Sequence, residues 1–281
     1  MIKKTQQQVM KDWGCRFQTP LVSVLCLTYN QESFISDAID GFLMQETSFP
    51  FEIIIGEDCS SDNTANIVRQ YKIKFPDIIS CILRTENIGA NSNFANCCQK
   101  AKGRYIATCD GDDYWTDPKK LETQVNCLQK NKNISLCFHK VNVTQRLNEN
   151  YRYKIPNKRI LKFNDILFTH YIPTASLMFK MEFLPNEYFS KQIANFSIGD
   201  IPLELTLVDR GNACFIPEIM AVYRRHENGI TENTEQIKNG RGTYIKVYSY
   251  LRKHLHYSHW LSLTLVILKT RLGAIKDLIK I

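Results

Sequence analysis

The first half of the chain alternates apolar runs with amphipathic stretches, and this alternation limits the possible folds more than any other feature. Strand character is expected in five runs, at residues 21–27, 51–55, 78–83, 105–109 and 134–138. Helices are predicted between them, at residues 32–44, 64–75 and 93–102, with another opened by Pro118. This order favours an α/β fold with a mostly parallel central sheet flanked by helices, whose ligands gather at the carboxyl ends of the strands.

Composition describes an ordinary globular protein: 281 residues, 44% hydrophobic and 23% charged, enough for one large α/β domain or two small ones. The amino terminus carries charge without an apolar segment behind it, so we expect no secretory signal and a cytoplasmic location. The ten cysteines follow no zinc-ligand spacing. Because four of them fall inside expected strands, we predict that they are reduced core residues: Cys26, Cys81, Cys109 and Cys137.

Charge is concentrated at the carboxyl terminus. Residues 238–281 hold nine Lys and Arg against one acid, Asp277, which accounts for the whole net charge of +8. Apolar residues recur there at helical spacing, at Leu261, Leu265, Leu268, Leu272, Ile275 and Ile279. We therefore predict one domain at residues 1–237, followed by a basic amphipathic helical tail at 238–281.

Two interpretations of this tail stay open. Residues 257–281 could contact the inner face of the plasma membrane peripherally, with Trp260 near the start of the helix, or the helix could pack on the core with its lysines in water. The uncharged run from Trp260 to Leu268 is too short to cross a bilayer. Nucleic acid is not expected as a partner, because basic and aromatic residues do not interleave.

Three carboxylates follow the fourth expected strand directly, in the segment Cys109-Asp110-Gly111-Asp112-Asp113. Mg²⁺ or Mn²⁺ prefers oxygen ligands and usually takes only one or two from protein, the rest coming from water and phosphates. Gly111 would let the backbone turn tightly enough to aim its neighbours at one point. Alone, such a segment is more often a solvated acidic turn; at the end of a strand it can be half of a diphosphate site.

The other strand ends also carry polar residues, which are Thr28, Tyr29 and Asn30 after the first run and Glu57, Asp58, Ser60 and Asp62 after the second. Tyr29 could lie against a nucleobase, and Asp58 could accept hydrogen bonds from a base or a ribose. Asp62 is expected to cap the next helix rather than bind a ligand. The loop at residues 84–90 is expected to close over the nucleotide.

These segments resemble the family 2 glycosyltransferases, which are inverting, nucleotide-sugar-dependent enzymes with a Rossmann-like GT-A fold. The resemblance extends from about Leu21 to Thr231. Its matching segments are residues 22–30, 51–62 (FEIIIGEDCSSD), 87–89 and 103–115 (GRYIATCDGDDYW). It implies that the half at about 20–140 binds a nucleotide-sugar donor, with a UDP-sugar as the first expectation. It also implies that the half at about 141–237 forms the acceptor site.

The resemblance also implies roles for single residues. Asp112 and His226 would hold Mg²⁺ or Mn²⁺, and Asp200 would be the catalytic base that takes the proton of the acceptor hydroxyl. The family usually has Glu where Gly199 stands. The residues expected to contact the nucleotide-sugar are Thr28, Tyr29, Asn30, Glu57, Asp58, Asn87, Gly89, Asp110, Gly111, Arg224 and Arg225.

The expected function is metal-dependent, inverting transfer of a sugar to a glycan or lipid-linked acceptor, in assembly of a bacterial surface polysaccharide or lipid-linked oligosaccharide. Glu57 stands where aspartate is commoner in the family and Cys59 where glycine is frequent, so the donor stays open. The Gln-x-x-Arg-Trp motif of processive synthases is absent from the sequence. Two alternatives remain: an Asp-x-Asp phosphotransferase or phosphatase, and a non-catalytic, membrane-tethered nucleotide-binding module.

Overall fold

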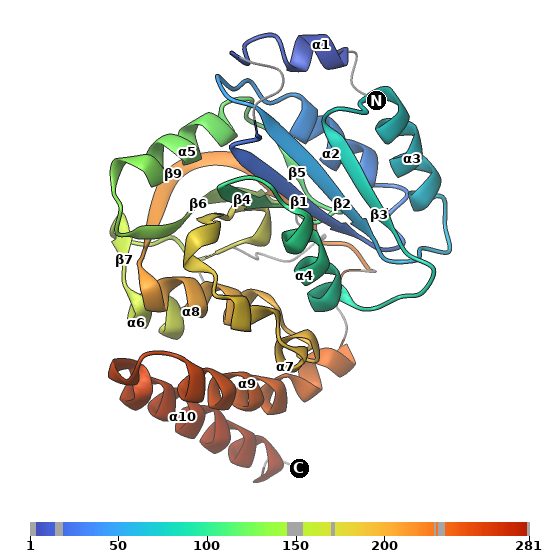
Figure 1. Cartoon of the computed structure of the whole chain (residues 1–281). Coiled ribbons are helices and arrows are strands. Elements are labelled where there is room, and N and C mark those ends of the chain that lie inside the picture. Colours follow the sequence, from blue (N-terminus) through green and yellow to red (C-terminus); the bar gives the residue numbers. More distant parts are fainter. Residues whose placement is uncertain are drawn as a thin grey trace.

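A nine-stranded sheet forms the middle layer of the computed structural model, which describes residues 4–14, 19–144, 154–169, 172–227, 229 and 234–279 (Figure 1). The strands lie in the order β3-β2-β1-β4-β8-β6-β9-β5, with β7 paired to β9. Their bounds are β1 Val22–Thr28, β2 Phe51–Glu57, β3 Ile79–Leu83, β4 Tyr105–Thr108, β5 Tyr114–Trp115, β6 Ile134–Val143, β7 Ile160–Leu161, β8 Met178–Lys180 and β9 Asn212–Tyr223.

Helices cover the sheet and continue beyond it. The α-helices are α1 Gln6–Val9, α2 Ile35–Leu43, α3 Thr64–Lys74, α4 Ala90–Lys100, α5 Lys120–Lys130, α6 Phe163–Phe168, α7 Lys191–Ala194, α8 Asp200–Arg210, α9 Thr234–His254 and α10 Trp260–Ile279. Single 3₁₀ turns lie at η1 Thr174–Ser176, η2 Met181–Phe183, η3 Asn186–Phe189 and η5 Tyr257–His259.

Parallel pairing brings three strand ends to one edge. β1 pairs parallel with both β2 and β4, and β2 pairs parallel with β3. In register, Thr28 at the end of β1 lies opposite Glu57 at the end of β2. The order changes direction at β8, which is antiparallel to both β4 and β6, whereas β6 and β9 are parallel again. The predicted mostly parallel α/β sheet is confirmed, and the polar residues after β1, β2 and β4 share an edge.

The two faces of the sheet pack against different helices. Val24, Ile53 and Ala107 belong to one core layer, together with buried residues of α2, α3 and α5. Leu25, Ile54 and Ile106 point the other way, into a second layer with α4, α6, α8, α9 and α10. Strands that are buried on both faces are apolar at nearly every position, and this is why the sequence shows them as continuous apolar runs.

The predicted elements differ from the observed ones mainly at their ends. The run at 134–138 continues to Val143 in β6, and the helix predicted at 93–102 begins earlier, at Ala90, after Gly89 with its positive φ of 81°. The helix expected to open at Pro118 begins at Lys120. Every cysteine that the structure describes is a free thiol, and Cys26, Cys109 and Cys137 are buried as predicted, whereas Cys81 is only partly buried against the core.

The carboxyl-terminal residues form a hairpin of two helices, in which α9 and α10 lie side by side below α6, α7 and α8 (Figure 1). Val247, Leu251 and Leu263 are buried in the same core layer as α8. One face of the predicted tail is therefore packed on the core. The predicted boundary between residues 237 and 238 falls inside α9, and the division into domain and tail stays a prediction. In the described part of the chain, every helix is too short or too polar to span a bilayer.

Candidate active site

The acidic turn after β4 is fastened to the end of β1 by its backbone. The amide of Gly111 donates to the carbonyl of Leu27 at 2.9 Å. A Cβ on residue 111 would lie 2.8 Å from Thr28 Oγ1 and 2.6 Å from Gln31 Oε1, both closer than real contacts allow. Glycine is thus required for the turn to approach these two side chains.

Those two oxygen atoms lack partners. Thr28 Oγ1 and Gln31 Oε1 are buried, and neither has a hydrogen-bond partner among the described residues. Leaving a buried polar atom unpaired costs about 1–3 kcal/mol, so such atoms in a folded protein usually serve a ligand or a bound water. Both lie against Gly111 of the acidic turn. Unpaired oxygens beside the turn are typical of a ligand site. Gln31 belongs to this candidate site and was not predicted from the sequence.

Carboxylates from distant parts of the chain meet here. Burial, followed by the negative charges of Asp112 and Asp200, raises the pKa of Asp110 to about 7. The pKa of Asp113 is raised well above its usual value, first by burial and then by the charge of Asp112. The charge of Asp200 therefore acts on the acidic turn, although the two are 90 residues apart in the sequence. The crowding of like charges favours a bound cation.

The two predicted metal ligands are neighbours. His226 Nε2 lies 3.1 Å from Asp112 Oδ2, and its ring packs on Phe34 with 4.6 Å between ring centroids. The Asp112 and His226 side chains are 21% and 17% exposed, so both are accessible. No three His, Cys, Asp or Glu side chains of the described residues form a complete cation site. The oxygen and imidazole donors nevertheless suit Mg²⁺ or Mn²⁺ that draws its remaining ligands from phosphates and water.

Arg224 holds the acidic turn in place. Its backbone amide donates to Asp113 Oδ1 at 2.8 Å, and its Nη1 donates to the carbonyl of Asp112 at 3.2 Å. The guanidinium also pairs with Asp37 and lies 4.2 Å from the ring centroid of Tyr114. The contacts shown for Arg224 are therefore with protein, and its expected contact with the donor stays a prediction. The structure places Arg225 beside β6, where its amide donates to Thr144 Oγ1 at 3.1 Å.

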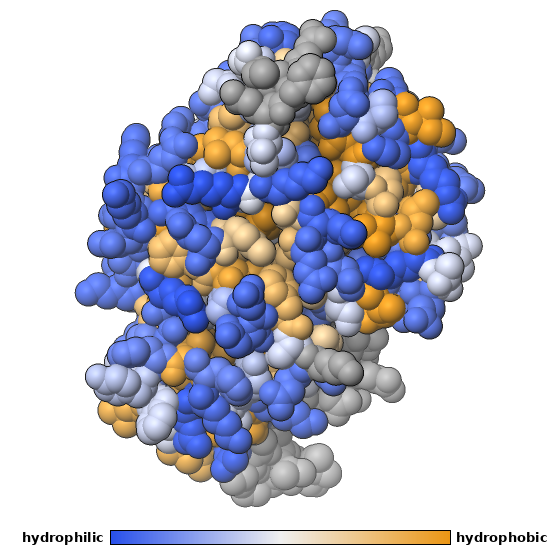
Figure 2. Space-filling model, viewed as in Figure 1, coloured by the Kyte–Doolittle hydropathy of each residue, from blue (hydrophilic) through white to orange (hydrophobic). Residues whose placement is uncertain are grey.

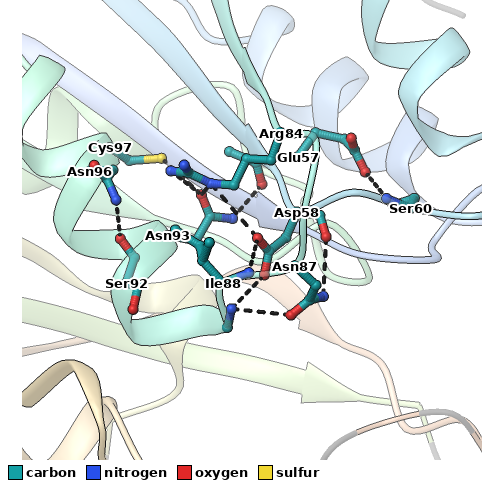
Figure 3. A network of polar contacts seen from close by, with 12 residues as sticks. Glu57, Asp58, Ser60, Arg84, Asn87, Ile88, Ser92, Asn93, Asn96 and Cys97 are labelled. Atoms are coloured by element: carbon teal, nitrogen blue, oxygen red, sulfur yellow. Dashed lines mark hydrogen bonds and ion pairs between the residues drawn. The ribbon is translucent and has the colours of Figure 1, made fainter.

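At the end of β2, Asp58 holds the loop before α4 (Figure 3). Its carboxylate accepts hydrogen bonds from the backbone amides of Ile88 at 3.0 Å and Gly89 at 2.9 Å. Asn87 Nδ2 donates to the Asp58 carbonyl at 3.1 Å, and Arg84 Nε lies 3.7 Å from Asp58 Oδ1. The structure thus brings Asp58, Asn87 and Gly89 together, and Asp58 shapes this loop; their expected contacts with the nucleotide stay predictions.

The ends of β1 and β2 are joined through Asn30. This residue has a positive φ of 52°; its amide donates to Ser60 Oγ at 2.9 Å, and its Oδ1 accepts from the Ser61 amide at 2.8 Å. Glu57 Oε1 in turn accepts from the Ser60 amide at 2.7 Å. Tyr29 is 48% exposed, which leaves its ring accessible to a planar ligand.

Asp62 precedes the N-cap residue of α3, which is Asn63, and accepts two backbone hydrogen bonds. Its two carboxylate oxygens accept from the amides of Thr64 at 2.9 Å and Glu32 at 3.0 Å. This arrangement fixes the start of α3 next to the loop after β1, and it occupies both oxygens of Asp62 with backbone donors.

Asp200 is the first residue of α8 and is exposed. Its position depends on the glycine before it, because a Cβ on Gly199 would collide with the side-chain amide of Asn91. Asn91 Nδ2 donates to the carbonyls of Ile193 at 3.2 Å and Phe196 at 2.5 Å. The space that the family's usual glutamate would need is thus filled by an amide of α4, which explains the departure at Gly199.

Further residues surround Asp200 that sequence reasoning did not find. Glu204 is buried one helical turn later, and its pKa is raised well above the usual value, first by burial and then by the charge of Asp200. Tyr244 and Tyr248 come from α9, and Asp200 contributes to raising the pKa of each, after burial. The four-residue spacing could have revealed Glu204. No local signal connects α9 with α8.

Comparison with known proteins identifies a family and relatives of this chain. The family model described as Glycosyl transferase family 2 matches residues 23–183. An uncharacterized protein of Mycobacterium tuberculosis, Rv1520, is 37% identical over 211 residues, which is 74% of this chain and 60% of that protein. The chain thus spans about three fifths of the length of this relative. The putative teichuronic acid biosynthesis glycosyltransferase TuaG of Bacillus subtilis is 30% identical over 217 residues, covering 76% of this chain and 82% of TuaG.

Solved structures share the fold at low sequence identity. The structure of S. aureus TarS residues 1–349 in complex with UDP-GlcNAc superposes with a TM-score of 0.71 at 15% identity, covering 90% of this chain and 72% of TarS. The mannosyltransferase PcManGT of Pyrobaculum calidifontis, in complex with GDP-Man and Mn²⁺, gives a TM-score of 0.63 at 16% identity over 97% of this chain and 81% of that one. The family model covers more than half of the sequence, and the chain belongs to glycosyl transferase family 2.

Proposed function

We propose that the protein transfers a sugar from a nucleotide-sugar donor to an acceptor hydroxyl, with inversion at the anomeric carbon. A UDP-sugar is the first candidate for the donor. The observation that carries this proposal is the electrostatic coupling of Asp110 to Asp112 and Asp200, with Asp110 and Asp112 in the turn after β4, at the edge where β1 and β2 also end. Family membership supports it, as does the superposition on TarS bound to UDP-GlcNAc.

On the donor side, the half-exposed ring of Tyr29 can stack on the base, and the unpaired oxygens of Thr28 and Gln31 can accept hydrogen bonds from the ligand. Asp112 and His226 would hold Mg²⁺ or Mn²⁺. When bound, such a cation supplies positive charge to the departing diphosphate. The Mn²⁺ in the PcManGT complex supports this assignment.

On the acceptor side, Asp200 takes the proton of the acceptor hydroxyl as that oxygen attacks the anomeric carbon. Attack from the side opposite the diphosphate inverts the configuration. The raised pKa of Glu204, one helical turn after Asp200, favours the neutral form of Glu204. Tyr244 is half-buried and borders this side of the site, where it can contact an acceptor sugar, whereas Tyr248 is buried behind it in the core.

We place the acceptor among glycans and lipid-linked saccharides of bacterial surface polysaccharide assembly. The similarity to TuaG, a putative teichuronic acid biosynthesis glycosyltransferase, supports this pathway. A lipid-linked acceptor would be embedded in a membrane, and an enzyme that used it would have to work at the membrane surface.

Asp200→Asn tests the assignment of the base. We expect sugar transfer, followed as release of nucleoside diphosphate, to fall by roughly 10²–10⁴-fold, because an amide cannot take the proton. Donor affinity, measured by calorimetry, should stay within about twofold, since Asp200 acts on the acceptor. Asp12→Asn removes an exposed carboxylate that pairs only with Lys11 in the described structure, and it should leave both quantities unchanged.

The same experiment separates the alternatives. A non-catalytic nucleotide-binding module would bind the donor but show no transfer in the unchanged protein. An Asp-x-Asp phosphotransferase would release inorganic phosphate or form an acid-stable phosphoenzyme, and this activity would depend on Asp110 instead of Asp200. Normal transfer by Asp200→Asn would refute the proposed base.

A further inference from the structure

The outer side of α10 is apolar and exposed. Leu261, Leu265, Leu268 and Leu272 follow one another at spacings of four, three and four residues and are 71%, 52%, 48% and 60% exposed. Tyr257 and Trp260 at the start of the helix are also exposed. We call these six residues the leucine stripe. Orange atoms appear along the lower edge of the molecule in Figure 2, near the α9–α10 hairpin.

The other side of the same helix is already packed. Leu263, Val266 and Ile267 are buried in the core layer that α9 and α8 share. A helix that covers a globular core needs a single apolar face, with polar residues opposite. The leucine stripe is therefore not needed to cover the core of this domain. A contiguous exposed apolar surface of this kind marks an interaction site.

A basic hollow adjoins the start of α10. Its volume is about 720 Å³, and its charged lining consists of Lys132, Lys158, Lys162 and Arg210 with Asp165 and Asp209. His259 also lines it, and burial lowers the pKa of its imidazole. We call it the basic groove. Lys158 is paired with Asp165 at 2.7 Å, whereas Lys132 and Arg210 make no ion pair with any residue that the structure describes. Lys132 and Arg210 also line a neighbouring hollow of about 600 Å³, together with Arg104 and Lys180.

The basic groove and the leucine stripe meet at one residue. The ring of His259 stacks on Phe163 with 3.7 Å between centroids, and its Nε2 lies 3.6 Å from Asp209 Oδ1 at the end of α8. Trp260, the next residue, belongs to the stripe. Neither feature contains a residue of the acidic turn, so this surface is separate from the proposed transfer site.

Charge indicates what covers this surface. Residues 238–281 carry the whole net charge of +8, and the basic groove adds cations beside them. A second copy of the chain would bring two such positive surfaces together, which is unfavourable. Leucines with aromatic rings at one end and cations around them suit the interface of a bilayer with anionic lipids. We propose that the leucine stripe and the basic groove form one surface that binds the protein to an anionic membrane.

Vesicle sedimentation with the 281-residue chain tests this surface. We expect binding to vesicles of phosphatidylcholine with phosphatidylglycerol, weaker binding to phosphatidylcholine alone, and loss of the difference at high salt. The double variant Leu261→Ser/Leu265→Ser should lower the partition coefficient by about tenfold or more. Lys132→Gln/Arg210→Gln should lower it by roughly fivefold per charge, on anionic vesicles only.

Helix α3 offers a matched control. Ile73 is 78% exposed and is flanked by Lys72 and Lys74, so Ile73→Ser and Lys72→Gln remove the same chemistry at a site remote from α10. Both should bind vesicles like the unchanged protein, and circular dichroism melting should confirm that all variants fold. The readout does not depend on sugar transfer, so its failure would leave the proposed activity untouched.

Three outcomes would overturn the proposal. The first is no binding to either kind of vesicle. The second is equal weakening by the α3 variants and the α10 variants. The third is a dimer in sedimentation equilibrium that Leu261→Ser dissociates, because a second copy would then cover the stripe.

Discussion

At the scale of single residues, the site depends on two glycines that make room for other side chains. Gly111 lets Thr28 and Gln31 reach the acidic turn, and Gly199 lets Asn91 fasten the segment before α8. Gly199 stands where the family usually has a glutamate before the base. Asp200 is thus positioned from outside its own helix, by an amide that belongs to α4.

Gly199→Ala tests this positioning. The added methyl group must displace the Asn91 amide, so we expect the free energy of unfolding to fall by about 1–3 kcal/mol, measured by urea denaturation. Asn91→Ala alone should also destabilise, because two carbonyls lose their donor. In the double variant the methyl group meets no amide, so the combined loss should be smaller than the sum of the two.

Gly242→Ala is the control for this cycle. A Cβ at residue 242 in α9 would meet nothing within 4 Å. The change should raise the free energy of unfolding by up to about 1 kcal/mol through helix propensity. Additive losses at residues 91 and 199 would show that the two side chains do not compete for one space.

The sequence predicts which candidate residues share an edge where they follow a strand, and it misses neighbours that come from elsewhere. Asp58, Asp110 and Asp112 could be predicted because parallel strands end at a common edge. Glu204 and Gln31 were missed, since burial beside Asp200 or under Gly111 is a property of the tertiary structure. The assigned ligand contacts, including those of Arg224 and Arg225, stay predictions.

At the scale of elements, uninterrupted apolar strands were predictable, whereas two-residue strands and a strand with an interrupted pattern were not. β1, β2 and β4 are buried on both faces, and their predicted ends agree with the observed ones within one or two residues. β5 and β7 have two residues each, too few to show a period. β9 was not predicted, because Pro217 and Glu218 interrupt its apolar pattern where the β6–β9 register shifts.

Helix α5 begins with a buried cation, which gives a test at this scale. The Lys120 ammonium lies 3.9 Å from the ring centroid of Trp115 and donates to Gln124 Oε1 at 2.7 Å. Burial lowers its pKa to about 7. The unfolded chain therefore binds the Lys120 proton more tightly than the folded protein does. The destabilisation from Lys120 is fully present below about pH 7 and is lost as the pH rises towards the usual lysine pKa.

Lys120→Met keeps most of the side-chain volume and removes the charge. The free energy of unfolding of the variant, minus that of the unchanged protein, is the quantity to measure, by urea denaturation. We expect this difference to be larger at pH 6 than at pH 9 by at least about 1 kcal/mol. Lys130→Met, at the exposed end of the same helix, should show no such change. A stability difference for Lys120→Met that is independent of pH would contradict the expected pKa.

At the scale of the whole molecule, charge is separated between two regions. Acidic side chains gather at the edge where β1, β2 and β4 end, and lysine and arginine side chains gather beside α6, α8 and α10. The acidic cluster raises the free energy of the folded protein, as the raised pKa values of Asp110 and Asp113 show. A ligand that neutralises this cluster should therefore stabilise the entire fold.

This stabilisation predicts cooperation between metal and nucleotide in thermal unfolding. UDP with Mn²⁺ should raise the Tm by more than the sum of their separate effects, because the diphosphate and Asp112 would share one cation. A ligand at roughly a hundred times its Kd adds about 2.7 kcal/mol, which corresponds to a Tm shift of about 5 °C or more in a domain of this size. Asp112→Asn should abolish the excess, and Asp12→Asn should retain it. A full shift with UDP and a chelator would exclude a shared cation, since the nucleotide alone would then account for the stabilisation.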